Sequence, residues 1–236
     1  MQGGSTETCY VCDRAATTRE HAPPKCFFPE QKDVGRDLRK NLISVPSCRD
    51  HNTARSNDDQ YVMAIVVMHF MTTGVARSQF ATKIIRTLKR STPLVKSLFR
   101  QPKNVTVDGE RTVAVGIDRV RFNRVMECTC RALVFHHSGE RIQDEVTIFS
   151  TGIFHPHRLE RDSDESSLEL AVRRILEGQP RLGENPEVFW YQFVHIPTQL
   201  TAVRLEFYGG FTVYGASDTR LKASAANSPP NAAKTP

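Results

Sequence analysis

The chain has 236 residues, 39% hydrophobic and 25% charged, which is the balance of an ordinary globular protein and excludes a low-complexity or collagen-like chain. With 32 Lys and Arg against 26 Asp and Glu, the net charge of +6 favours a polyanionic partner such as nucleic acid. The polar residues 1–8 lack the apolar core of a secretory signal, and the apolar run from Val62 to Met71 is too short to cross a bilayer. We therefore expect a cytoplasmic protein whose cysteines are reduced thiols or metal ligands.

The first predicted elements are short and surround a dense group of Cys, His and Asn residues. Pro23-Pro24 ends the first strand, because proline cannot continue a strand ladder or a helix. Ser47 or Asp50 is the expected cap of the helix that carries His51 and Asn52. In chain order we expect a polar tail (1–8), a Cys-containing turn (9–12), a strand (14–19), a charged loop (25–40), a strand (42–45) and a helix from Cys48.

Three further helices are predicted over residues 60–73, 78–90 and 93–100. Gly74 is expected to end the first, whose apolar residues recur at helical spacing. In the second, an apolar face of Phe80, Ile84 and Leu88 leaves a basic cluster elsewhere on the helix: Lys83, Arg86, Lys89 and Arg90. That cluster is interpreted either as a phosphate contact or as a solvated helix face.

A change of character at Gln101-Pro102 divides the chain into an N-terminal domain (1–102), a mixed domain (103–216) and a disordered tail (217–236). The mixed domain is predicted from turn residues, caps and alternation. Asp118 should cap its long helix and Gly139 should end it. Its expected elements are a hairpin (105–107, 112–115), a helix (119–137), a strand (146–150), a helix (167–176) and an antiparallel meander (188–195, 202–208, 211–214). The fold class is α+β.

Two residue pairs have the spacing of zinc ligands. Cys9 and Cys12 are separated by two residues, and so are Cys48 and His51. Three thiolates and one imidazole are an ordinary tetrahedral zinc set, so we predict a structural zinc ion. The alternative is that these are unrelated core or surface residues. The remaining cysteines are expected to stand apart, Cys26 in a basic loop and Cys128 and Cys130 in the core.

Further polar residues lie between the two pairs or directly after them: Glu20, His21, Asn41 and Asn52. Together with the short motifs E-H-x-x-P-K and N-x-x-R-S, this pattern resembles the HNH endonuclease family over about residues 9–56, in its variant with two zinc-binding pairs. The resemblance implies a zinc-stapled ββα-metal (His-Me finger) core. It also implies a hydrolase that cuts DNA phosphodiester bonds as a nickase or a double-strand cutter.

The resemblance implies a role for each of these residues. His21 would be the general base, since an unperturbed histidine has a pKa of about 6.5. Glu20 and Asn52 would supply oxygen ligands to a catalytic Mg²⁺ or Mn²⁺ ion. Asn41 would hold the loop that orients His21.

Two basic residues would contact nucleic-acid phosphates, Lys25 after the strand and Arg55 one turn beyond Asn52. The sequence departs from the family pattern twice: His51 stands where cysteine is commoner, and Glu20 stands where aspartate is commoner. His51 is therefore open to an alternative role on the second metal.

DNA is the expected partner, with RNA less favoured, and residues 103–216 are expected to select DNA, form a homodimer or dock a partner protein. A non-catalytic zinc module that binds nucleic acid or protein is the rival interpretation. An RNase or toxin subunit is a third. The histidines at 136–137 and 155–157 are expected at the surface, and the aromatic residues near 189–191 and 207–211 in the core, with base stacking as the alternative.

Overall fold

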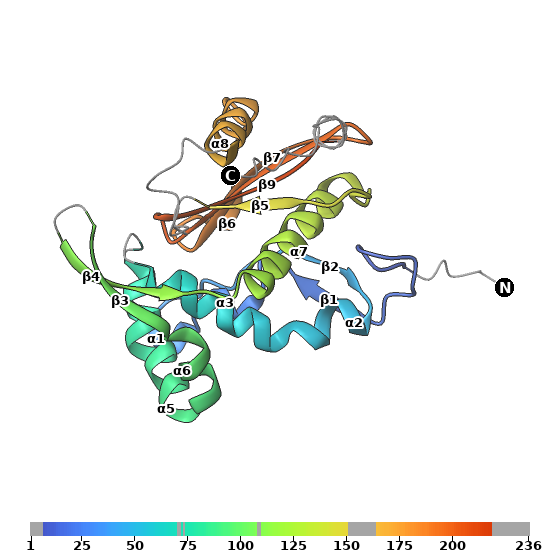
Figure 1. Ribbon diagram of the computed structural model, residues 1–236. Coiled ribbons are helices and arrows are strands. Elements are labelled where there is room, and N and C mark those ends of the chain that lie inside the picture. Colours follow the sequence, from blue (N-terminus) through green and yellow to red (C-terminus); the bar gives the residue numbers. More distant parts are fainter. Residues whose placement is uncertain (1–6, 70–71, 73, 108–109, 151–163, 219–236) are drawn as a thin grey trace, which may run out of the picture.

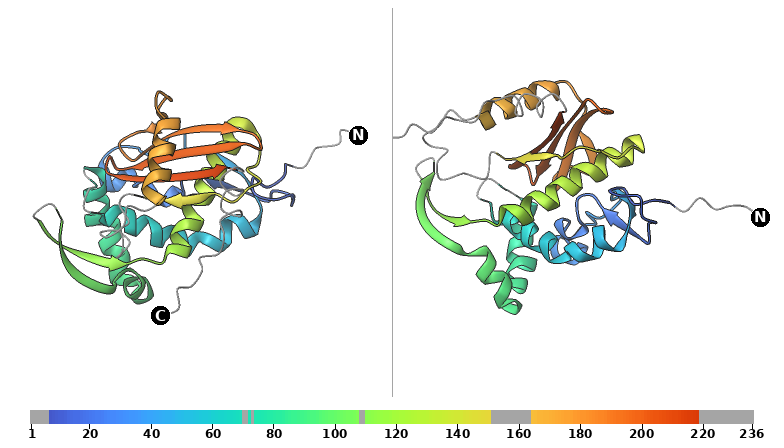
Figure 2. Two further views of the ribbon diagram at one scale, coloured as in Figure 1. Left: turned by 45° about the horizontal axis from the view of Figure 1, so that its top comes forward. Right: turned by 45° about the vertical axis from the view of Figure 1, so that its right-hand side comes forward.

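The computed structural model describes residues 7–69, 72, 74–107, 110–150 and 164–218 (Figure 1). It is an α+β protein with antiparallel sheets, as predicted. Figures 1 and 2 show successive layers: helix α8 (Asp164–Ile175), a five-stranded sheet, helix α7 (Arg119–Ser138), and then the N-terminal hairpin with helix α3 (Ser56–Met68). Helix α7 is therefore covered on both sides.

The N-terminal hairpin pairs β1 (Thr18–His21) with β2 (Ser44–Ser47) in antiparallel register, with His21 opposite Ser44. Both strands begin later in the chain than predicted. The connection between them includes two short helices where a loop was expected, η1 (Lys25–Phe27) and α1 (Gln31–Val34).

Two short turns, α2 (Arg49–Asn52) and η2 (Thr53–Arg55), lead from β2 into α3. The predicted cap of α2 is wrong. Cys48 occupies the N-cap position without a side-chain hydrogen bond, so neither Ser47 nor Asp50 caps the helix.

Helix α3 is buried almost all round, from Tyr61 to Val67. It begins before the predicted residue 60 and ends at Met68, well before Gly74. The early end has a local cause: His69 turns to an extended conformation, and its carbonyl accepts a hydrogen bond from the Thr72 hydroxyl at 2.7 Å. Apolar periodicity cannot detect such a turn, since Val62–Met71 is apolar at every position except His69.

The next helices form an arm that is drawn at the lower left of Figure 1. It contains α4 (Val75–Gln79), the π-helical turn η3 (Phe80–Ile84), α5 (Ile85–Arg90) and α6 (Thr92–Leu98). Ile84 is buried as predicted, whereas Phe80 is 38% exposed. The chain continues into a two-stranded ribbon, β3 (Arg100–Val107) with β4 (Glu110–Gly116), which projects from the molecule.

Helix α7 matches its prediction to within one residue. The Asp118 side chain accepts a hydrogen bond from the Arg121 amide at 3.2 Å, and Gly139 ends the helix with a φ of 72°. A left-handed residue at this position is the usual helix end, and glycine adopts it without steric cost.

The C-terminal sheet has the strand order β5-β9-β8-β7-β6. The three meander strands were predicted, but the edge strand β6 was missed because its sequence, LGEN, is glycine-containing and polar. The predicted tail begins too early, since β9 extends to Asp218, and residues 219–236 lie outside the described residues. The strands are β5 (Thr147–Phe149), β6 (Leu182–Asn185), β7 (Phe189–Ile196), β8 (Leu200–Phe207) and β9 (Phe211–Asp218).

One buried cluster runs through both sides of the predicted boundary at residue 102, from Tyr61 in α3 through Phe122 in α7 to Phe207 in β8. The Tyr208 hydroxyl donates to the carbonyl oxygen of Phe27, and the Asn185 amide donates to that of Lys40 at 3.1 Å. The division at 102 stays a prediction about folding units. No described helix is long and apolar enough to cross a membrane.

Candidate metal centre and hairpin site

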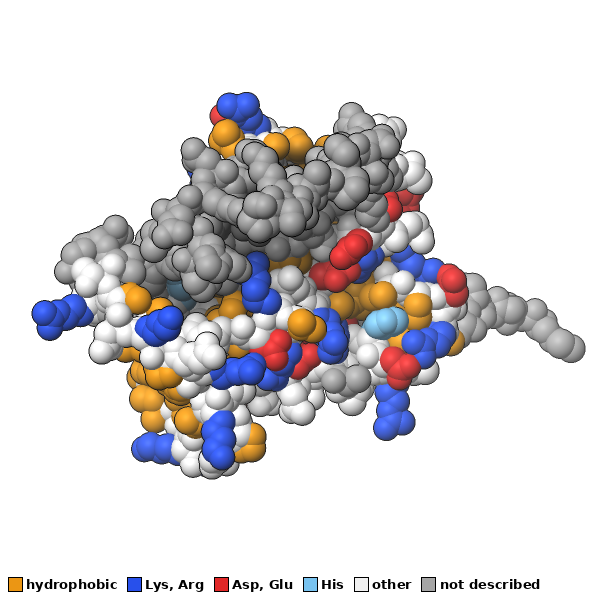
Figure 3. All heavy atoms as spheres, viewed as in Figure 1, with side chains coloured by type: hydrophobic (Ala, Val, Ile, Leu, Met, Phe, Trp, Pro, Cys, Tyr) orange, Lys and Arg blue, Asp and Glu red, His pale blue; other side chains and the backbone are white. Residues whose placement is uncertain are grey.

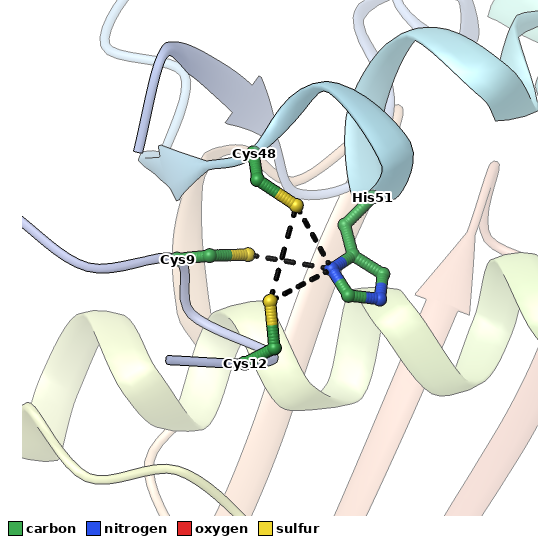
Figure 4. A group of neighbouring side chains, drawn as sticks. All are labelled: Cys9, Cys12, Cys48 and His51. Atoms are coloured by element: carbon green, nitrogen blue, oxygen red, sulfur yellow. Dashed lines mark hydrogen bonds between the residues drawn. The ribbon is translucent and has the colours of Figure 1, made fainter. Parts of the chain in front are cut away.

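Cys9, Cys12, Cys48 and His51 converge on one point (Figure 4), and their ligand atoms all lie within 4.8 Å of one another. The Nδ1 atom of His51 is 3.5 Å from the Sγ atoms of Cys9 and Cys12 and 3.2 Å from that of Cys48. The Sγ atoms of Cys12 and Cys48 are 3.9 Å apart. These four residues, from two segments far apart in the sequence, are positioned to hold a metal ion.

The spacing fits zinc. With Zn–S bonds of about 2.3 Å and Zn–N bonds of about 2.0 Å, a tetrahedral site needs about 3.8 Å between sulfurs and about 3.5 Å between sulfur and nitrogen. Burial lowers the pKa of His51, and the nearby charge of Arg14 lowers it further. Both effects favour the neutral imidazole, the form that coordinates zinc.

Backbone hydrogen bonds set this geometry. The Cys9 amide donates to the carbonyl of Arg14 at 2.9 Å, which closes the turn that carries Cys12. The Tyr10 amide donates to the carbonyl of Pro46 at 2.9 Å, which ties that turn to β2. The amides of His51 and Asn52 both lie 3.2 Å from the carbonyl of Cys48, so α2 begins at a ligand and carries the next one.

The other cysteines stand apart from this cluster, as predicted. Burial raises the pKa of Cys26 to about 12, which leaves its thiol protonated and unsuited to metal binding. Cys130 is fully buried in the core. Cys128, on α7, is largely buried near Tyr10 and Arg55.

His51 and Asn52 are adjacent but serve different contacts. The Nδ2 atom of Asn52 donates to the Thr18 hydroxyl at 3.1 Å and to the Arg19 carbonyl at 3.0 Å. Asn52 therefore fastens α2 to β1 while His51 faces the metal cluster. The alternative role of His51 on a second ion is not supported by this geometry.

Glu20 is buried, and its carboxylate is bound by Arg55 and Tyr10. Its side chain is only 8% exposed, one carboxylate oxygen pairs with the Arg55 guanidinium, and the other accepts a hydrogen bond from the Tyr10 hydroxyl at 2.8 Å. Arg55 is itself 5% exposed, so it does not reach solvent phosphate. The two charges neutralise each other in the interior, and the predicted roles of Glu20 as an ion ligand and of Arg55 as a phosphate contact stay predictions.

His21 points away from this pair, because successive side chains of a strand face opposite sides. It is partly exposed, and its Nδ1 atom is buried with no hydrogen-bond partner among the described residues. Burial lowers the pKa of His21, the Ile43 carbonyl opposes that shift, and the charges of Lys25 and Arg19 lower it further. The ring is therefore neutral at pH 7 and able to accept a proton.

Asn41 does not hold the loop as expected. It is exposed, has a φ of 51°, and makes no side-chain hydrogen bond within the described part of the chain. Asparagine tolerates this left-handed conformation better than most residues, so its place in the turn is a backbone effect. The predicted phosphate contact of Lys25 stays a prediction; the residue is exposed at the start of η1.

Sequence reasoning missed the buried polar cluster around Arg55. Burial raises the pKa of Asp59 to about 6, although the charge of Arg55 opposes that shift. One Asp59 oxygen is buried without a hydrogen-bond partner in the described structure. The four-residue spacing of Arg55 and Asp59 was the available signal, since such residues meet on one helix face.

The other histidines and aromatics have structural roles. His137 stacks on Phe193, and its Nε2 atom lies 2.7 Å from the hydroxyl of the buried Tyr191. The predicted aromatic core is confirmed, since the aromatic residues near 189–191 and 207–211 are buried, whereas residues 155–157 lie outside the described chain.

Comparisons with protein-family models, curated proteins and solved structures find no match to this chain.

Proposed function

We propose that this chain is an endonuclease that hydrolyses DNA phosphodiester bonds, with His21 as the general base. The observation that carries the proposal is the state of His21: a partly exposed, neutral imidazole with Arg19 and Lys25 close enough to lower its pKa. A base of this kind between two cations suits a substrate that is an anion and is attacked by water. The order of hairpin, metal ligand and helix also agrees with the HNH resemblance.

The chemistry assigned to the chain is limited to its own groups. His21 takes a proton from a water molecule, the water oxygen attacks phosphorus, and the bond to the departing oxygen breaks. The electron pair stays on that oxygen, which takes a proton from solvent. Lys25 stabilises the negative charge that grows on the phosphate oxygens, whereas the guanidinium of Arg19 is held by Glu7 and Ser44. Zinc at the four-residue cluster holds the hairpin and α2 together, and it supplies no bond to the substrate.

A catalytic Mg²⁺ or Mn²⁺ site does not fit the residues that were predicted to form it. Glu20 is neutralised by Arg55 and Tyr10, which leaves the side-chain oxygen of Asn52 as the remaining donor of the pair. No step is therefore assigned to such an ion.

The burial of Glu20 also favours a second candidate, a zinc module that binds nucleic acid or protein without cleaving it. A buried Glu20–Arg55 pair needs no catalytic explanation, because it joins β1 to η2, the turn that leads into α3. In that case His21 would be an ordinary partly buried histidine.

Nicking of supercoiled plasmid tests the proposal. Wild-type protein, His21→Ala and the matched control His136→Ala, at an exposed helix end, are incubated with plasmid DNA, with and without added Mg²⁺ or Mn²⁺. We expect His136→Ala to match wild type and His21→Ala to be slower by about 10²–10⁴-fold, the usual contribution of a general base. Equal nicking by all three proteins would remove His21 from the chemistry. No nicking by wild type under any condition would favour the binding module.

A further inference from the structure

The basic charge of the chain is concentrated in one segment. Residues 60–107 contain eight Lys and Arg and no Asp or Glu: Arg77, Lys83, Arg86, Lys89, Arg90, Lys96, Arg100 and Lys103. The whole chain has a net charge of +6, so the remaining residues together carry 6 − 8 = −2. One segment therefore accounts for all of the positive excess.

Two of these cations are already used inside the protein. Lys83 donates to the carbonyl of Cys26 at 2.9 Å, and Arg86 makes two 3.1 Å hydrogen bonds to the carboxylate of Asp33. A third, Arg100, lies 4.0 Å from Asp118. The predicted basic cluster of the second helix is therefore split, since only its last two members are available.

The other five are exposed and have no acidic partner among the described residues: Arg77, Lys89, Arg90, Lys96 and Lys103. They lie on α4, α5, α6 and β3, which are consecutive in the chain and form the arm and ribbon of Figure 1. In Figure 3, blue side chains mark this lower left part of the molecule without red ones among them. The arm is thus a positive surface that its own fold does not neutralise.

The arm is also tied to the candidate site. Both Lys83 and Gln79 donate to the carbonyl of Cys26, in the turn that follows His21, at 2.9 and 3.0 Å. The exposed Lys25 begins that same turn. The arm is therefore joined by hydrogen bonds to the turn that follows His21 and that carries the exposed Lys25.

We propose that the surface formed by α4–α6 and strand β3 docks the phosphate backbone of double-stranded DNA. Duplex DNA carries one charge per about 1.7 Å of its axis, so an extended row of unpaired cations complements it along a length and not at one point. This surface would bind the DNA that the proposed nuclease cleaves, and in that respect the proposal rests on the proposed function. The contacts are to the backbone, so this surface binds without sequence preference.

The test measures binding and not cleavage. Fluorescence anisotropy follows a labelled 24-base-pair duplex of arbitrary sequence, over a range of salt concentrations, in proteins that all carry His21→Ala. The variant Lys89→Gln/Arg90→Gln removes two cations from the last turn of α5. Its matched control, Arg173→Gln/Arg174→Gln, removes two exposed cations from the last turn of α8.

We expect the α5 variant to bind about 10-fold or more weakly at 0.1 M salt, and the slope of log K against log salt to fall by up to about 2. The α8 control should keep the affinity and slope of its parent, and circular dichroism should show both folded. Equal losses in the two variants, or unchanged binding in the α5 variant, would overturn the proposal. So would tighter binding of poly-glutamate or of an RNA duplex of the same sequence. Because the assay measures binding and every protein carries His21→Ala, the result stands whether or not the chain is a nuclease.

Discussion

The N-terminal hairpin module and the C-terminal sheet are stabilised in different ways. The hairpin has two strands of four residues, and it depends on a four-ligand cluster and a buried ion pair. The sheet has five strands, three of them eight residues long, with buried aromatic rings such as Phe207 and Phe211 and a helix against each face.

The difference follows from size. A two-stranded hairpin has too little apolar surface to be stable alone, so we expect metal binding and charge pairing to add to its packing. The large sheet buries enough apolar side chains to need neither. The Cys/His cluster and the buried ion pair therefore lie in the region with the smaller sheet, although both regions share one hydrophobic cluster.

Removal of the metal should separate the two regions most strongly. Cys12→Ala, or a zinc chelator, should reduce bound zinc from about one per chain to near zero and unfold the hairpin, because metal binding and folding are coupled at such sites. Hydrogen exchange should then show lost protection at the amides of Tyr10 and Ala22, with the β7–β9 amides still protected.

Cys26→Ala is the control, since its thiol lies outside the cluster and its loss should leave the zinc content unchanged. Simultaneous loss of protection in the hairpin and in β7–β9 would contradict the comparison and make the two regions a single cooperative unit.

Breaking the buried pair should have the next largest effect. Arg55→Ala leaves the carboxylate of Glu20 buried without its cation, which costs about 3–5 kcal/mol. Arg14→Ala removes an arginine of the same module whose partner is Asp50, but both side chains are 60% or more exposed, so the cost should be about 0–1 kcal/mol. Urea denaturation measures both. Comparable losses for the two variants would mean that the buried pair is no more important than a surface one.

The smallest effect should be a pH dependence from Asp59, which belongs to the buried polar network of the N-terminal half. Burial raises the pKa of Asp59 to about 6, above its usual value of about 3.9 in an unfolded chain. Between these values the folded state binds more protons than the unfolded one, so this residue lowers stability as pH rises through 4 to 6.

Asp59→Asn should therefore add about 1–3 kcal/mol to the stability at pH 7 and little at pH 4. Urea midpoints at the two pH values measure the difference. An equal gain at both would show that the carboxyl group of Asp59 does not titrate in this range.

What the sequence predicted well was local. The ends of α7 follow from Asp118 and Gly139, each next to the turn it controls, and the zinc ligands follow from their own spacing. What failed depended on tertiary contacts. The sequence predicts Glu20 to be a metal ligand, but it does not show that Arg55, 35 residues further along the chain, forms an ion pair with it. The sequence also could not predict which basic residues of the arm are exposed, because Lys83 and Arg86 bind partners in the N-terminal loop.

Helix α7 lies between the two regions compared above, and this position limits its evolution. It contacts β2 on one side and β5 and β9 on the other. At its crossing with β9, an added Cβ on Gly215 would lie 2.7 Å from the sulfur of Cys130, so a side chain there would force the Cys130 side chain or its neighbours to shift. A mutational scan of α7 should therefore find tolerance in a narrow stripe that includes Val120, which is 69% exposed, and selection around the rest of its circumference.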